Sequence, residues 1–148
     1  MGRPAMIRAP QFRAPFFQEE IPMKKIALLA ASAALIATPA LADVAAQLST
    51  AQTHAGMAAK QTDIKDVQKH LHHAVNCLVG PSGKGFDAAA GNPCAKAGAG
   101  AIPDSADAAQ KTKLQAIADS AASGLTTTDL THAQHSAQAA ADAIGAAK

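Results

Sequence analysis

The histidines are the residues of this chain whose type and spacing could support chemistry. Five of the six fall in two clusters, one of His70, His72 and His73 and one of His132 and His135. His70 and His73 are three residues apart, and so are His132 and His135. Residues three or four positions apart lie on one face of an α-helix, so each pair would present two imidazoles side by side. Neutral imidazole is a good ligand for zinc, copper and nickel. The spacing therefore predicts binding of transition-metal ions.

Further candidate ligands flank these pairs. Asp66 precedes the first pair by four residues and Asp129 precedes the second by three, which adds a carboxylate to each set. His54 is followed three residues later by Met57, whose thioether favours cuprous ion. Two ligands from one helix rarely complete a coordination shell, so we expect several modest surface sites rather than one buried centre. The candidate metal ligands are His54, Met57, Asp66, His70, His73, Asp129, His132 and His135.

Two other interpretations of the histidines stay open. A histidine on the polar side of a helix is usually only a solvated residue, and the chain would then be a metal-free structural or stress-related helical protein. The second alternative is a b-type haem binder that uses Met57 and a histidine of the last helix as axial ligands. It fits poorly with a chain whose only aromatic residue after position 42 is Phe86.

Nothing in the sequence predicts catalysis. Residues 80–85 faintly resemble a phosphate-binding loop, but they follow an expected helix and lack the final Ser or Thr. After position 42 the chain has no glutamate and no Gly-x-Ser-x-Gly motif. We therefore expect a binding protein and not an enzyme.

The beginning of the chain indicates export. Residues 23–42 combine a positively charged start, a short apolar run and a small-x-small ending at Ala42, which is the pattern of a secretory signal peptide. Residues 1–22 contain three arginines, several prolines and two glutamates, so we interpret them as an over-extended start that is not part of the protein. We expect cleavage after Ala42, a mature domain of residues 43–148 and a periplasmic location.

Loss of residues 1–42 would change the charge of the protein. All three arginines and both glutamates lie there, which leaves eight lysines and nine aspartates, a formal charge of −1 instead of +2. A chain without arginine and near zero net charge lacks the basic surface that binds nucleic acid or anionic membranes. The expected partners are therefore metal ions, with no nucleic acid and no membrane, and the alanine-rich faces are compatible with a homo-oligomer.

The apolar pattern predicts an all-α fold. Apolar residues recur every three or four positions along most of the chain after residue 43. The first two expected helices are residues 43–60 and residues 64–78, the second capped by Thr62 or Asp63. The other two are a segment capped by Asp104 or Ser105 and stopped by Gly124, and a segment starting at Thr127 or Thr128. Four helices of similar length predict a small antiparallel four-helix bundle.

One long Gly/Pro-rich loop and one disulfide complete the expected fold. Residues 80–103 hold most of the glycines and all of the prolines that follow position 42. Cys77 and Cys94 are the only cysteines, and in an oxidising periplasm we expect them to pair and close this loop. Such a bond stabilises the fold by about 3 kcal/mol in the chain-entropy view. The alternative role for either cysteine is a thiolate metal ligand or redox group.

Overall fold

The structure, a computed structural model, describes residues 42–148. Within these residues the fold is all-helical and contains no strand, which confirms the predicted all-α class. The predicted over-extended start and signal peptide lie outside the described residues, apart from Ala42. The helices are α1 (Val44–Ala58), α2 (Ile64–Val79), α3 (Ala101–Asp104), α4 (Ala108–Thr126) and α5 (Leu130–Gly145).

An aspartate begins each of the four long helices. Its carboxylate accepts a hydrogen bond from one or two of the first backbone N–H groups, which have no partner inside the helix. The cap of α2 is Asp63, which confirms one of the two predicted residues. The cap of α5 is Asp129, which directly follows the predicted Thr127 and Thr128. The four capping residues are Asp43, Asp63, Asp107 and Asp129.

The start of α4 differs from the prediction. Its cap is Asp107, not Asp104 or Ser105. Asp104 instead ends the short helix α3, and its Oδ2 accepts hydrogen bonds from Gln47 Nε2 and from the backbone N–H of Ala99, each at 2.7 Å. The carboxylate is therefore already used by tertiary contacts that the local pattern does not reveal.

Gly124 does not stop α4, as the sequence led us to expect, but lies inside its last turns and is buried. A Cβ atom at this position would lie 2.7 Å from Cδ2 of Leu71 in α2 and 2.9 Å from Cβ of Ser136 in α5. The missing side chain thus lets α4 approach both neighbouring helices closely. Glycine here serves packing and not helix termination.

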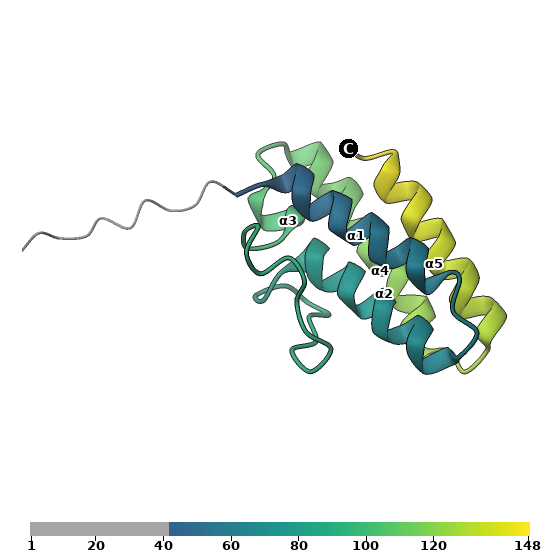
Figure 1. Cartoon of the computed structure of the whole chain (residues 1–148). Coiled ribbons are helices and arrows are strands. Elements are labelled where there is room, and N and C mark those ends of the chain that lie inside the picture. Colours follow the sequence, from purple (N-terminus) through teal and green to yellow (C-terminus); the bar gives the residue numbers. More distant parts are fainter. Residues whose placement is uncertain (1–41) are drawn as a thin grey trace, which may run out of the picture. The chain divides into compact units, whose positions relative to one another are not determined.

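The core lies between the four long helices. Each of α1 and α4 packs against both α2 and α5, and α3 contacts α1, α2 and α4 (Figure 1). Alanines make up much of the buried surface, so the helix axes can lie close together. Among the described residues, no helix has the length and apolar character needed to cross a membrane. The largest fully buried apolar side chains are Leu48, Leu71, Leu78, Leu114 and Ile144.

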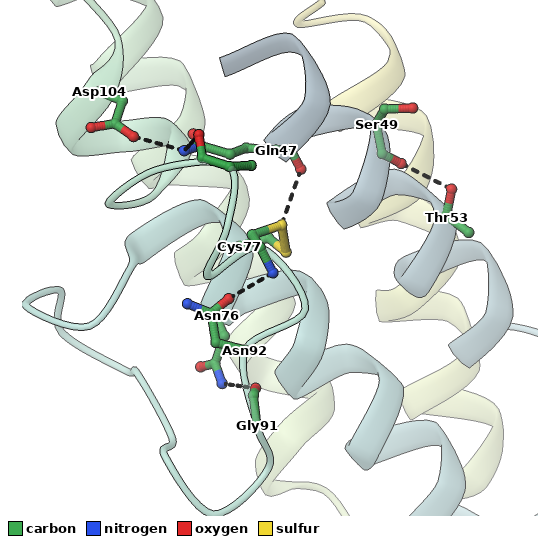
Figure 2. Close-up of a disulfide and its surroundings, with 10 residues drawn as sticks. Gln47, Ser49, Thr53, Asn76, Cys77, Gly91, Asn92 and Asp104 are labelled. Carbon is green, nitrogen blue, oxygen red and sulfur yellow. Dashed lines mark hydrogen bonds between the residues drawn. A yellow bond between two sulfur atoms is a disulfide. The ribbon is translucent and has the colours of Figure 1, made fainter. Parts of the chain in front are cut away.

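Residues 80–100 join α2 to α3 without helix or strand, so the predicted loop is shortened at its end by α3. The predicted disulfide is present between Cys77 in α2 and Cys94 in this segment, with the two Cα atoms 5.2 Å apart. The sulfur of Cys94 lies 3.8 Å from the carbonyl oxygen of Gln47 in α1 (Figure 2). The bond therefore fastens the loop at the boundary between α1 and α2.

Candidate metal centre

Three histidines from two helices meet in the structure: His54 of α1 with His70 and His73 of α2. One ring nitrogen from each lies within 4.8 Å of the others. The Nδ1 atoms of His54 and His70 are 3.4 Å apart, and the ring centroids are separated by 4.8 to 5.8 Å. Among the described residues this is the only group of three or more histidine, cysteine or acidic side chains close enough to hold one ion. We call it the three-histidine cluster.

The packing of α1 on α2 creates the cluster. Ala51 and Ala55 of α1 are fully buried, and such small side chains allow close approach of the helices that pack on α1, α2 among them. His54 directly precedes Ala55 and is half-buried at the edge of this contact. In the same way, His70 directly precedes the buried Leu71 and His73 directly precedes the buried Ala74. All three imidazoles therefore lie at the border between the core and solvent.

A backbone carbonyl orients His73. Its Nε2 atom lies 2.6 Å from the carbonyl oxygen of Ala90, and a carbonyl only accepts, so Nε2 carries the proton and donates. In the neutral ring the lone pair is then on Nδ1, which is buried and has no hydrogen-bond partner among the described residues. Metal-binding histidines commonly donate their other N–H group to a carbonyl in this way. Nδ1 of His73 is therefore the atom available to a metal.

The electrostatics of the cluster favour neutral rings. The pKa of His54 lies below its ordinary value of 6.5, first because of burial and then because of positive charge on His73 and His70. The pKa of His70 is lowered too, chiefly by burial and next by His73 and Lys69, while Asp66 opposes the shift. A neutral imidazole can coordinate a metal without first losing a proton. Near pH 7 the rings of His54 and His70 are therefore neutral and can coordinate a cation.

The spacing can be compared with known coordination geometry. Zinc–nitrogen bonds of about 2.05 Å place two tetrahedral ligands about 3.3 Å apart, whereas adjacent square-planar ligands would be about 2.8 Å apart. The observed 3.4 Å between Nδ1 of His54 and Nδ1 of His70 fits the tetrahedral case. The third nitrogen has to move closer by about 1.5 Å or less, since its separation is within 4.8 Å. Three protein ligands would leave a fourth position for water or another ligand.

The other candidate ligands are not brought into this cluster. His132 and His135 are exposed on α5, and an oxygen of Asp129 accepts a hydrogen bond from the backbone N–H of His132 as the helix cap. Asp66 is exposed and lies outside the three-histidine group. Met57 is 40% exposed at the surface of α1. The structure therefore groups His54 with the histidines of another helix, and metal binding by the other candidate ligands stays a prediction.

Two residues around the cluster were not predicted from the sequence, Asn76 and Ala90. Ala90 contributes only its backbone carbonyl, so no side-chain pattern could identify it. Asn76 follows His73 by three residues in α2, and its side-chain amide binds the loop backbone on both sides of Ala90. A buried asparagine within an amphipathic helix was the one available signal, since such a polar side chain needs a partner.

Comparison of this chain with protein-family models, with curated proteins and with solved structures finds no match. The function proposed below therefore depends on the residues and geometry of the cluster.

Proposed function

We propose that this protein is exported to the periplasm and binds one transition-metal ion through His54, His70 and His73, as a buffer or carrier. The observation that carries the proposal is the convergence of three imidazoles from two helices, with ligand nitrogens within 4.8 Å of one another. Three ligands from different helices restrict geometry far more than two from one helix. The chemistry proposed is binding and release of the ion, not catalysis.

Zinc and copper are the principal candidates for the ion. The 3.4 Å separation between two ligand atoms favours tetrahedral zinc. The intrinsic affinity of nitrogen ligands is instead higher for copper than for nickel or zinc, and this favours copper. Geometry and intrinsic affinity therefore favour different ions, and a competition titration with both ions measures which effect is larger.

Two features support an exported carrier. The pattern of residues 23–42 is that of a signal peptide, and a disulfide between Cys77 and Cys94 is stable in an oxidising compartment. The half-buried rings at the border of the core leave a fourth coordination position for water or a competing ligand. Such a position allows an ion to exchange with another molecule.

The same proposal includes an antiparallel four-helix bundle as the scaffold, with a Gly/Pro-rich loop closed by the disulfide. The side-by-side packing of α1, α2, α4 and α5 supports it (Figure 1). So do the short connections between α1 and α2 and between α4 and α5, which favour antiparallel neighbours. In this scaffold two adjacent helices supply all three ligands.

The test is calorimetric titration of the exported, disulfide-intact protein with zinc and with copper. We expect one tightly bound ion per chain, and loss of this binding when the three histidines of the cluster are replaced by alanine. The matched control replaces His132 and His135 by alanine and should leave the tight binding unchanged. If the unmodified protein binds metal no more tightly than the cluster variant, the metal-free structural alternative holds.

A further inference from the structure

One face of α2 carries both a metal ligand and the attachments of the loop. His73, Asn76 and Cys77 are spaced at i, i+3 and i+4, so they lie together on the helix. All three contact the same stretch of chain, residues 87–94: His73 through Ala90, Asn76 through the backbone on both sides of Ala90, and Cys77 through the disulfide. The loop is therefore fastened next to the ligand that it touches.

Asn76 fixes both ends of the segment 87–91. It is fully buried, and its Nδ2 donates to the carbonyl oxygen of Asp87 at 2.7 Å. The same Nδ2 donates to the carbonyl oxygen of Gly91, also at 2.7 Å (Figure 2). Its Oδ1 accepts from the backbone N–H of Asp87 at 2.9 Å. Three hydrogen bonds from one rigid helical side chain hold the intervening residues in a single conformation. The carbonyl of Ala90, between these ends, is thereby aimed at His73.

We propose that Asn76 and the Cys77–Cys94 disulfide are positioning groups for the metal site: they hold the Ala90 carbonyl against Nε2 of His73, so that Nδ1 faces the ion. This inference rests on the proposed function of the three-histidine cluster. Neither group touches the metal. Each acts through the loop, and metal affinity therefore depends on whether the loop is closed.

The expected size of the effect follows from other metal sites. Loss of an outer-shell partner of a ligating histidine typically weakens metal binding by about 10- to 100-fold, because the ring loses its fixed tautomer and orientation. Without the Ala90 carbonyl, either nitrogen of His73 can carry the proton and the ring can turn. Asn76→Ala should therefore weaken zinc binding by about 10- to 100-fold.

Gln47→Ala is the matched control. Gln47 is as fully buried as Asn76, and its Nε2 likewise donates to the loop region, to the carbonyl of Ala97 and to Asp104. Its side chain donates to residues that follow the segment 87–91 and forms no hydrogen bond with that segment. We expect Gln47→Ala to lower the melting temperature about as much as Asn76→Ala but to leave zinc affinity unchanged.

The tautomer of His73 is measured separately, by nitrogen NMR of the metal-free protein. The unmodified protein should show a single tautomer with the proton on Nε2 and slow exchange of that proton, and Asn76→Ala should show fast exchange. A double variant, Cys77→Ala with Cys94→Ala, opens the loop without adding thiols that could bind zinc. It should show the same fast exchange and the same weakening of zinc binding, and it serves as the test if Asn76→Ala fails to fold.

The outcomes separate this inference from the proposed function. If zinc binds the unmodified protein tightly and neither loop variant weakens it, the positioning role is wrong and the metal site stands. If the unmodified protein shows the single Nε2–H tautomer but binds neither zinc nor copper, the proposed function fails and the inference fails with it. Weakening by both loop variants, with Gln47→Ala unchanged, supports the inference.

Discussion

Two helices of this protein carry the same short pattern of histidines, yet only one pair becomes part of a cluster. His70 and His73 in α2 have the same three-residue spacing as His132 and His135 in α5. The α2 pair is half-buried and meets His54, whereas the α5 pair is exposed. The spacing on one helix thus defines a pair of ligands, but packing against a second helix decides whether a third ligand joins them.

The difference lies in how each pair is placed relative to the core. On α2 each of the two histidines directly precedes a buried residue, Leu71 or Ala74, and is itself half-buried at the border of the core. On α5 the buried face is formed by other residues, chiefly alanines, and the histidines lie outside it. The carboxylate nearest in sequence to the α5 pair, Asp129, caps the helix and is held by its backbone. A shared sequence pattern therefore has different chemical consequences at the two places.

The largest expected effect is the loss of zinc affinity in His54→Ala, because this substitution leaves the α2 pair without a third ligand, like the α5 pair. Removal of a direct ligand should cost more than the roughly 100-fold upper range for an outer-shell partner, so we expect zinc affinity to fall by more than about 100-fold. Titration calorimetry with zinc measures the change. Equal affinity of the variant and the unmodified protein would show that His54 is not a ligand.

Met57→Ala is the control for this variant. Met57 lies on the same helix as His54, three residues later, but is 40% exposed and was expected from the sequence to be a ligand. Zinc has little preference for a thioether, so we expect zinc affinity to change by less than about threefold. A large loss of zinc affinity in Met57→Ala would show that Met57 belongs to the site.

The sequence predicted the parts of this molecule that depend on local pattern. The helix periodicity, the cap at Asp63 and the single cysteine pair were all readable from the sequence, because each depends on near neighbours or on composition. The meeting of His54 with the α2 pair was not readable, since it depends on which faces of α1 and α2 pack together. The prediction that Gly124 ends a helix was wrong for the same reason, because this glycine serves close contact with other helices.

Gly124→Ala tests the packing of α4 against α2 and α5, the two helices that carry a histidine pair. The new methyl group would lie within 3.0 Å of Leu71, the neighbour of His70, and of Ser136, the neighbour of His135. Crowding of this kind typically costs about 1–3 kcal/mol, partly offset by the better helix propensity of alanine, about 1 kcal/mol. We expect a net loss of up to about 2 kcal/mol in the free energy of unfolding, measured by urea denaturation.

Gly56→Ala provides the opposite case on α1. A Cβ at Gly56 would meet nothing within 4 Å among the described residues. Only the gain in helix propensity remains, so the free energy of unfolding should rise by about 0.5–1 kcal/mol. Destabilisation by both substitutions would mean that the close approach of α4 to α2 and α5 is not the cause.

A smaller effect is expected from pH on the metal-free protein. The pKa values of His54 and His70 are lowered in the folded state, so the unfolded chain binds more protons once the pH falls below about 6.5. The free energy of unfolding should therefore decrease from pH 7.5 toward pH 5. Replacing both histidines by alanine should reduce this slope. An unchanged slope in the double variant would contradict the burial of the cluster.

The smallest expected effect concerns Asp66, the carboxylate that the sequence placed with the α2 pair. It is exposed and outside the three-histidine group, so it acts on the cluster only through its charge. That charge raises the pKa of His70 against the lowering by burial. Asp66→Asn should therefore lower this pKa further and ease proton release, while it removes a weak attraction for the cation. These opposing effects are screened by solvent, and we expect less than about a threefold change in zinc affinity at pH 7, measured by competition with a chelating dye. A loss comparable to that of His54→Ala would instead make Asp66 a direct ligand, and the site would then resemble the helix-face set that the sequence predicts.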